Sequence, residues 1–308
     1  MKLVFMGTPD FSVSVLKAIM NSNHEITAVV TQPDKQKGRG KELAFTPVKQ
    51  FAVEAGIPVL QPQRIKSDEA FEELSNIEAD IFVVVAYGQI LSKRILDLPK
   101  YGCINVHASL LPKYRGAAPI QWAILDGEAQ SGVTIMQLDE GMDTGDMLLK
   151  QAVPISPEET GASLHDKLAE TGAILCVDAL NQIEEGTITR TPQNGAESSY
   201  AKMLTKQMGK LHFNQPAAVI ERKVRGLNSW PSAYMMLEGK ILKIWKARVS
   251  DQLSNGQPGT VAHVSKNSFS INTSDYQIDI LEVQPEGKKR MDTACFLLGH
   301  KIEAGSSL

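Results

Sequence analysis

Short apolar runs alternate with helical patterns over the first half of the chain. Runs of strand length occur at Leu3–Met6, Ile26–Val30, Ile81–Ala86, Cys103–His107, Thr134–Leu138 and Met147–Val153. Segments with helical patterns lie between or after them, at Pro9–Met20, Pro47–Ala55, Ile120–Leu125 and Thr160–Ile183. Regular alternation of strands and helices predicts an α/β domain with a mostly parallel sheet and right-handed crossovers.

The second half of the chain has a different pattern. Residues Gly186–Phe213 are polar and rich in turn formers, and they predict a linker. Pro216–Leu227 predicts one helix, and short strands follow at Ala233–Leu237, Lys240–Ala247, Gly259–Val264, Ser268–Asn272 and Gln277–Gln284. Short strands at close spacing favour a small, OB-like β-barrel. We therefore predict an N-terminal domain over 1–185, a linker over 186–213 and a C-terminal barrel over 214–308.

Composition is that of an ordinary globular protein. The chain has 308 residues, 43% hydrophobic and 22% charged, which is long enough for two domains. No apolar run approaches the length of about 18 residues that a membrane span needs. The apolar stretch in the opening MKLVFMGTPDFSV is too short for a signal peptide. It predicts a first strand instead. We therefore expect a cytoplasmic protein, and nothing in the pattern demands more than a monomer.

The three cysteines, Cys103, Cys176 and Cys295, are far apart in the sequence. An odd number with no CxxC pair argues against a disulfide framework or a zinc site and fits a reducing compartment. We predict that all three are small buried residues. The histidines show no metal-ligand spacing either, so no metal is expected.

Charge is distributed unevenly along the chain. Residues 206–308 contain 14 Lys and Arg against 9 Asp and Glu, a net charge of +5. Residues 1–205 contain 18 against 26, a net charge of −8, which leaves −3 for the whole chain. A basic C-terminal part suggests contact with an anionic macromolecule, although a solvated basic surface would have the same composition.

Asn105 and His107 stand two residues apart at the end of a predicted strand, and Asp143 follows 36 residues after His107. Residues two apart on a strand point to the same face, so both side chains can reach one reacting atom. If Asp143 meets His107 in space, its carboxylate would orient the imidazole and favour the charged ring. The Asn105 amide would then be a donor for an oxyanion.

This set contains no evident side-chain nucleophile. Ser109 is the nearest hydroxyl, and no GxSxG elbow surrounds it. The pattern therefore suggests direct transfer of an acyl group between two substrates, although Asn-x-His spacing alone is also typical of a structural pair. The turn Gly7–Asp10 lacks a GxGxxG pattern, and the chain has no GxxxxGK[ST] loop, so neither dinucleotide nor nucleoside triphosphate chemistry is indicated.

The segment Gln32–Ala44 predicts a polar loop on the side of the sheet where the site is expected. It carries Lys35, Lys37, Arg39 and Lys41 among glycines. Glycines give such a loop conformational freedom, and its cations favour phosphate contacts, although a solvated loop has the same composition.

Longer motifs resemble one family closely. NVHASLLPKYRGAAPIQWAI at 105–124, DEGMDTGDML at 139–148 and MGTPDFSV at 6–13 are similar to the methionyl-tRNA formyltransferase family. The similarity continues through TQPDKQKGRGKELAFTPVK at 31–49 and SSYAKML at 198–204, so it spans the chain. The HxSLLP and DxGxDTG pieces are shared with the wider class of 10-formyltetrahydrofolate-dependent formyltransferases.

The resemblance implies a Rossmann-like formyltransferase domain and a C-terminal β-barrel that binds tRNA. It implies transfer of a formyl group from 10-formyltetrahydrofolate to the amino group of methionyl initiator tRNA. By the same resemblance Asn105, His107 and Asp143 are catalytic, and Arg39, with Lys37 and Lys41 beside it, contacts the tRNA. Folate contacts are implied for Ser109, Leu110, Leu111 and Pro112 and for Ala86, Tyr87, Gly88, Gln89, Ile90 and Leu91.

Three alternatives remain open from the residues. The chain could formylate a small amine, or it could hydrolyse 10-formyltetrahydrofolate with water as the acceptor. From a different class of protein, it could be a non-catalytic RNA-binding module. The basic Gly-Arg-Gly loop argues against a small-amine enzyme, and the Asn105, His107 and Asp143 set argues against a simple binder.

Overall fold

The computed structural model describes residues 1–37 and 42–308. Its packing divides the chain into two compact units, which are described separately below. The first unit contains Met1–Pro119, Gln130–Pro154 and His165–Ala201, and the second contains Ile120–Ala129, Ile155–Leu164 and Lys202–Leu308. Boundaries at 185 and 213 stay a prediction. Of the predicted tRNA-contacting residues, Arg39 and Lys41 lie outside the described residues.

A seven-stranded sheet forms the centre of the first unit, in the order β10-β9-β7-β6-β1-β2-β5. Neighbours from β5 to β7 pair in parallel, whereas β9 pairs antiparallel with both β7 and β10. This confirms the predicted α/β class with a mostly parallel sheet. The strands are β1 (Lys2–Gly7), β2 (Glu25–Val30), β5 (Val59–Leu60), β6 (Ile81–Val85), β7 (Cys103–His107), β9 (Gln130–Gln137) and β10 (Met147–Pro154).

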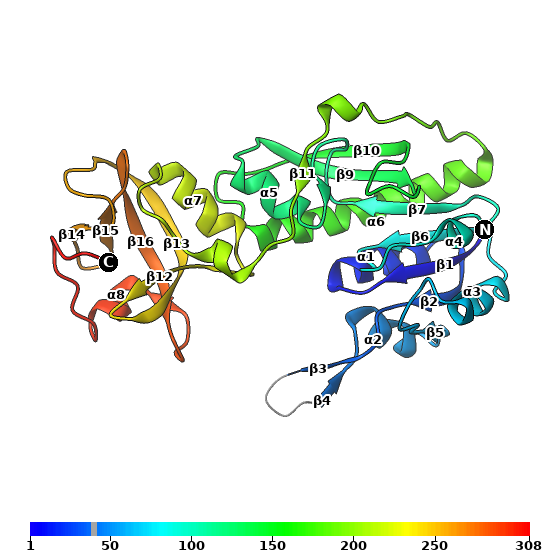
Figure 1. The fold of residues 1–308 in the computed structure, drawn as a ribbon, viewed down its shortest axis with the longest axis horizontal. Coiled ribbons are helices and arrows are strands. Elements are labelled where there is room, and N and C mark those ends of the chain that lie inside the picture. The colour runs from blue at the N-terminus through cyan, green and yellow to red at the C-terminus, as the bar shows by residue number, and fades with distance from the viewer. Residues whose placement is uncertain (38–41) are drawn as a thin grey trace. The chain divides into compact units, whose positions relative to one another are not determined.

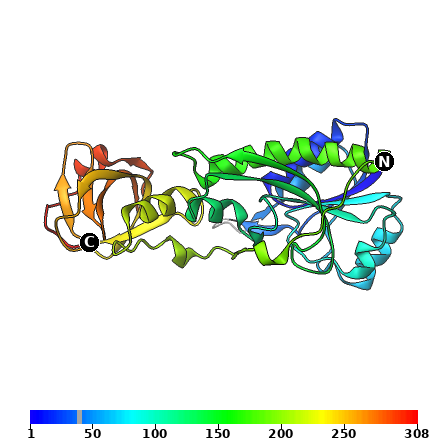
Figure 2. The same ribbon diagram turned by 90° about the horizontal axis from the view of Figure 1, so that it is seen from above.

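Helices cover both faces of this sheet, as Figure 2 shows. Because side chains alternate along a strand, one face of β1 and β6 packs against α3 and α4 in a common core. On the other face α6 crosses closely, since a Cβ on its Gly172 would lie 2.9 Å from Cγ1 of Val106. The helices are α1 (Asp10–Met20), α2 (Pro47–Glu54), α3 (Asp68–Ser75), α4 (Lys93–Leu96), α5 (Pro119–Leu125) and α6 (Gly161–Glu185).

The predicted polar loop Gln32–Ala44 contains regular structure, which corrects that expectation. Strands β3 (Lys35–Lys37) and β4 (Glu42–Ala44) pair antiparallel and form a hairpin (Figure 1). Another short pair joins β8 (Arg115–Gly116) to β11 (Tyr200–Ala201) in parallel. The second pair attaches the predicted linker to the segment that follows His107.

An antiparallel sheet with the helices α7 and α8 packed on it lies in the second unit (Figure 1). Its strands run in the order β12-β13-β16-β15-β14, and β17 pairs with β16. The described residues show no pairing between β12 and β14, so the closed barrel stays a prediction. The elements are α7 (Ala217–Gly226), β12 (Ala233–Leu237), β13 (Lys240–Leu253), β14 (Val261–Val264), β15 (Phe269–Asn272), β16 (Tyr276–Pro285), β17 (Met291–Asp292) and α8 (Thr293–Leu297).

The cysteines differ in their burial. Cys103 and Cys176 are buried, as predicted, and burial raises the pKa of each thiol to about 12. Cys295 is exposed, so its predicted burial was wrong. It lies on the short helix α8, where Thr293 and Phe296 occupy the inward positions. In the part of the chain that the structure describes, no helix has the length and apolar character needed to cross a membrane.

Candidate active site

Strand β7 places Asn105 and His107 at the carboxyl end of the sheet, where open α/β sheets bind ligands. It pairs with β6 on one side and β9 on the other, so its backbone is held on both edges. Val106 points the opposite way, towards α6. Within the described ranges, the amide of Asn105 has no hydrogen-bond partner from the protein.

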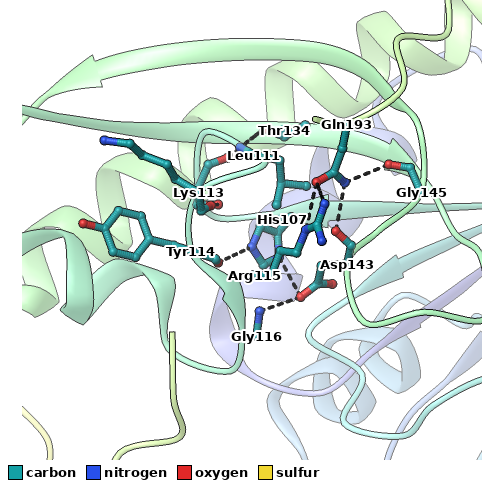
Figure 3. A network of polar contacts seen from close by, with 11 residues as sticks. His107, Leu111, Lys113, Tyr114, Arg115, Gly116, Thr134, Asp143, Gly145 and Gln193 are labelled. Carbon is teal, nitrogen blue, oxygen red and sulfur yellow. Dashed lines mark hydrogen bonds and ion pairs between the residues drawn. The ribbon is translucent and has the colours of Figure 1, made fainter. Parts of the chain in front are cut away.

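His107 is buried and held at both ring nitrogens (Figure 3). Nε2 lies 2.9 Å from the carbonyl oxygen of Tyr114, so Nε2 carries a proton and donates it to this carbonyl. Nδ1 lies 3.8 Å from Oδ2 of Asp143, which is within ion-pair distance but too long for a hydrogen bond. The structure therefore brings His107 and Asp143 together, which the sequence pattern alone left as a supposition.

A tightly organised loop between β9 and β10 presents Asp143. Oδ1 of Asp139 accepts bonds from the Gly141 amide at 3.0 Å and the Thr144 hydroxyl at 2.8 Å, which closes the turn. Gly145 has no room for a side chain, because a Cβ there would lie 1.8 Å from the carbonyl oxygen of Gln137. These contacts give a physical reason for the spacing of the DxGxDTG motif.

The Asp143 backbone has a φ of 54°, in the left-handed region that Asp tolerates better than most residues. Its Oδ2 accepts a 2.7 Å bond from the Gly116 amide, which comes from the loop after β7. The side chain of Asp143 is 16% exposed. The carboxylate is therefore placed by two separate loops, and sequence spacing alone could not have predicted the second one.

The segment from Ser109 to Pro112, predicted to border the folate, is mostly packed inside the protein. The Ser109 hydroxyl donates to the carbonyl of Lys113 at 2.7 Å, and the Ser109 carbonyl accepts from Thr134. Leu111 is fully buried in a small cluster with Met136 and Met147. Leu110 and Pro112 are half-buried. Folate contact by this segment stays a prediction.

The loop Ala86–Leu91 follows β6 and so lies beside the carboxyl end of β7. It exposes Ala86, Gly88 and the side chain of Ile90, which is 62% accessible. Tyr87 and Leu91 instead point into the core, and burial raises the pKa of the Tyr87 phenol to about 12. An apolar surface with accessible backbone at this position suits a flat aromatic ring.

Several residues that support these loops were missed by sequence reasoning. The carbonyl of Tyr87 accepts bonds from the Thr8 hydroxyl at 2.9 Å and the Gln32 amide at 3.2 Å. Gln89 accepts a bond from the Ile65 amide at 2.8 Å, which ties the end of the loop to the preceding segment. Thr8 stands in the MGTPDFSV motif and Gln32 in the TQPDKQKGRGKELAFTPVK motif, and these motifs were the available signals for them. Ile65 carried no signal.

The base of the β3–β4 hairpin is also built from charged residues. Lys49 forms an ion pair with Asp34, and Gln61 donates to the same carboxylate at 2.9 Å. The Lys49 ammonium, with the Gln61 amide second, lowers the pKa of Asp34 below its ordinary value. Lys37, one of the predicted tRNA contacts, belongs to β3.

Comparison with known proteins supports this description of the fold and site. A model of the formyl transferase family matches residues 1–180, and the model of the formyl transferase C-terminal domain matches residues 203–301. The methionyl-tRNA formyltransferase of Agathobacter rectalis is 54% identical over 306 residues, which cover 99% of each chain. That of Clostridioides difficile is 48% identical, also over 99% of each chain. The chain belongs to the formyl transferase family.

Solved structures share the same fold at low identity. The sugar 3N-formyl transferase WlaRD, determined in the presence of dTDP and 5-N-formyl-THF, superposes with a TM-score of 0.70 at 23% identity. That match covers 94% of this chain and 99% of WlaRD. HypX from Aquifex aeolicus in complex with tetrahydrofolic acid has a TM-score of 0.64 at 19% identity, over 99% of this chain and 50% of HypX. The resemblance to both concerns the fold.

Proposed function

We propose that this chain transfers the formyl group of 10-formyltetrahydrofolate to the amino group of methionyl initiator tRNA. The single observation that carries the proposal is the 46–54% identity, over the whole length, to relatives named methionyl-tRNA formyltransferase. The juxtaposition of His107 and Asp143 at the carboxyl end of the sheet supports it. It also argues against a non-catalytic RNA-binding module, because a binder has no need of such a pair.

The described residues fit a folate at this site. Ile90 in the loop after β6 and Met142 beside Asp143 are both large apolar side chains that are more than half exposed, at 62% and 52%. They would contact the two faces or edges of a pterin ring, while the backbone at Ala86 and Gly88 would pair with its polar edge. When bound, 10-formyltetrahydrofolate supplies a formyl group attached to N10.

The roles of the catalytic set follow from elementary chemistry. The neutral amine of the aminoacyl ester is itself the nucleophile, which accounts for the missing side-chain nucleophile. Asn105 would donate its amide N–H to the formyl oxygen as negative charge develops there. His107, oriented by Asp143, would help to carry the proton from the attacking nitrogen to N10, directly or through water. One C–N bond forms as the other breaks, so no redox partner is needed.

The tRNA would contact both units. In the second unit a cavity of about 740 Å³ is lined by five cations, three glutamates and an indole. Its cations suit phosphates, and the indole suits an unpaired base. In the first unit we assign to Arg39, with Lys37 and Lys41, the contact with the acceptor end of the tRNA.

Arg39→Ala should lower turnover on methionyl-tRNA without weakening folate binding. Equal loss of both would contradict the role given to this loop.

The decisive experiment incubates the protein with 10-formyltetrahydrofolate and methionyl-tRNA and then looks for formylmethionine on the tRNA. Formylmethionyl-tRNA is the expected product. Free formate without a formylated product would favour a hydrolase. Formylation of an amino sugar in preference to the charged tRNA would favour a small-amine enzyme.

Two further properties belong to this proposal. A charged tRNA as substrate places the reaction in the cytoplasm. We infer that the protein works as a monomer, because both proposed substrates can be assigned to residues of one chain. Sedimentation at working concentration in the presence of tRNA should give one copy per tRNA, and a dimer would contradict this inference.

A further inference from the structure

One residue of the predicted linker is bonded into the active site. Of residues 189–200, all within the described part of the chain, only Gln193 is not exposed. Its Oε1 accepts bonds from Arg115 at 3.0 Å from Nε and 2.8 Å from Nη2. Its Nε2 donates to the carbonyls of Asp143 and Gly145, both at 2.8 Å. Both donors and both acceptor positions of the amide are therefore satisfied.

These bonds complete a closed network around His107 (Figure 3). Arg115 lies between Tyr114, whose carbonyl accepts from His107, and Gly116, whose amide donates to Asp143. Gln193 joins the Arg115 side chain to the backbone of Asp143. The two loops that contact opposite sides of the imidazole are thus connected twice, directly by the bond from Gly116 to Asp143 and through the side-chain amide of Gln193.

The backbone of Asp143 needs such support. Its φ of 54° lies in a region that costs a residue with a side chain free energy unless the surroundings hold it. Gln193 bonds the carbonyl of Asp143 itself and that of Gly145 two residues later. An amide that bridges both carbonyls fixes the turn on which the carboxylate is mounted, and the distance of 3.8 Å to His107 depends on that turn.

We propose that Gln193 is a positioning residue that holds Asp143 against His107, and so connects the linker to the chemistry of formyl transfer. The expected effect on kcat rests on the proposed function, whereas the effect on the position of Asp143 does not. Gln193 does not touch the reacting atoms. It acts through the donor half of its amide, while the acceptor half anchors it to Arg115.

Two substitutions separate these halves. Gln193→Glu keeps an acceptor for Arg115 but turns an oxygen towards the carbonyls of Asp143 and Gly145. Gln193→Met keeps the approximate volume and removes every hydrogen bond. Both should lower kcat by about 100-fold, the scale on which small misplacements of catalytic groups act. KM for methionyl-tRNA should stay at the wild-type value, because the residues assigned to the tRNA lie outside this network.

Asn194→Ala is the matched control. Asn194 is the next residue of the linker, and its side chain bonds Ala196 and Glu197 nearby. It should behave as wild type in every measurement. A kcat loss of the same size in this variant would mean that any change in the linker disturbs the enzyme, and it would overturn the specific role of Gln193.

An NMR measurement tests the structural claim without any turnover. The Gly116 amide donates a short bond to the Asp143 carboxylate, which shifts its proton to low field. In both Gln193 variants this resonance should move upfield as Asp143 withdraws, and in Asn194→Ala it should not move. An unmoved resonance, or a normal kcat in Gln193→Met, overturns the proposal. If wild type forms no formylmethionyl-tRNA, the proposed function fails, whereas the Gly116 resonance still decides the role of Gln193.

Discussion

His107 is surrounded by hydrogen-bond acceptors. The Tyr114 carbonyl accepts from Nε2, and the Asp143 carboxylate faces Nδ1. In this arrangement the ring has no nitrogen directed at open space, whereas the Asn105 amide has no protein partner among the described residues. Asn105 is therefore the group already available to the formyl oxygen, and His107 would reach a substrate proton by giving up one of its two contacts.

The charge of Asp143 can be tested apart from its shape. Asp143→Asn keeps an oxygen for the Gly116 amide but removes the negative charge facing His107. We expect kcat to fall by at least about 100-fold, as for loss of a general acid–base contribution, with an unchanged melting temperature. Steady-state kinetics with methionyl-tRNA measure the effect. Glu140→Gln makes the same charge change at an exposed position of the same loop and should be silent. Full activity in Asp143→Asn would exclude a catalytic role for its charge.

The site was predictable from sequence only in part, for a definite reason. Asn105 and His107 share a strand, and alternation along a strand is a local property, so their common face could be inferred. Asp143 could be predicted only from the DxGxDTG motif, because its position depends on a turn that Asp139 and Gly145 close. Gln193 had no signal at all: it lies in a polar segment without periodicity, and only the folded chain brings it to Arg115.

At the scale of elements, the clarity of the hydrophobic pattern mattered for which helices and strands could be predicted. The buried strand β7 and the long helix α6 were found near their observed bounds. The helix α3 was missed although two of its eight residues, Ala70 and Leu74, are buried, the same number as in the predicted helix α2. The pairs β3–β4 and β8–β11 were missed because each strand has two or three residues and exists only through its partner.

Gly145→Ala tests whether the turn between β9 and β10 tolerates any side chain. The added methyl would overlap the carbonyl oxygen of Gln137, so the backbone must shift where Gln137 donates to Asp146 at 2.8 Å. We expect a loss of about 1–3 kcal/mol in unfolding free energy, typical of overpacking, and a strong loss of kcat. Gly195→Ala is the control, because nothing lies within 4 Å of its Cβ position. Wild-type stability and turnover in Gly145→Ala would contradict the steric argument.

The start of α7 is capped by a residue from a distant turn. Oδ1 of Asp275 accepts a 2.8 Å bond from the Ala217 amide, and Pro216 at the N-cap position has no side chain for this task. That backbone bond, followed by those from Tyr276 and Thr273, lowers the pKa of Asp275 below its ordinary 3.8. The ionised carboxylate therefore stabilises the fold above the unfolded-state pKa, and this contribution is lost as pH falls through the lower folded-state pKa.

Asp275→Ala should thus cost about 1 kcal/mol of unfolding free energy at neutral pH, the usual value of a lost helix cap. The difference from wild type should shrink as the pH falls below 3.8. Tryptophan fluorescence during urea unfolding is the appropriate measurement, because Trp122, Trp230 and Trp245 all belong to the second unit. Asp251→Ala, an exposed carboxylate on β13, serves as the control. A difference that does not depend on pH would refute the assignment to the charged cap.

At the scale of the whole molecule, the positive charge of the C-terminal part favours the tRNA, and not the folate, as its partner. The last 103 residues carry a net charge of +5, and some of their cations pair with neighbouring carboxylates. Arg248 pairs with Asp279, Arg290 with Glu282, and Arg225 with Glu221. Such pairs carry no net charge, so the excess of +5 lies on cations outside them, and binding of tRNA should depend on these cations.

Lys246 is one cation that the fold directs outward. The pairing of β13 with β16 shifts register on either side of it, so Lys246 is exposed while Ile244 and Ala247 are buried. It lines the cavity of the second unit. A β-bulge is a common way to re-aim a side chain at a functional surface. We therefore expect Lys246 to contact a phosphate of the tRNA.

Lys246→Ala should raise KM for methionyl-tRNA at low salt and leave KM for 10-formyltetrahydrofolate unchanged. The measurement is KM for the tRNA between about 50 and about 200 mM salt, where each lost phosphate contact reduces the log–log slope by about 0.9. Lys266→Ala removes an exposed lysine in the turn between β14 and β15, away from the cavity, and should leave the slope intact. Since counterion release depends on contacts and not on total charge, equal slopes for the two variants would mean that the net charge, rather than this cavity, attracts the tRNA.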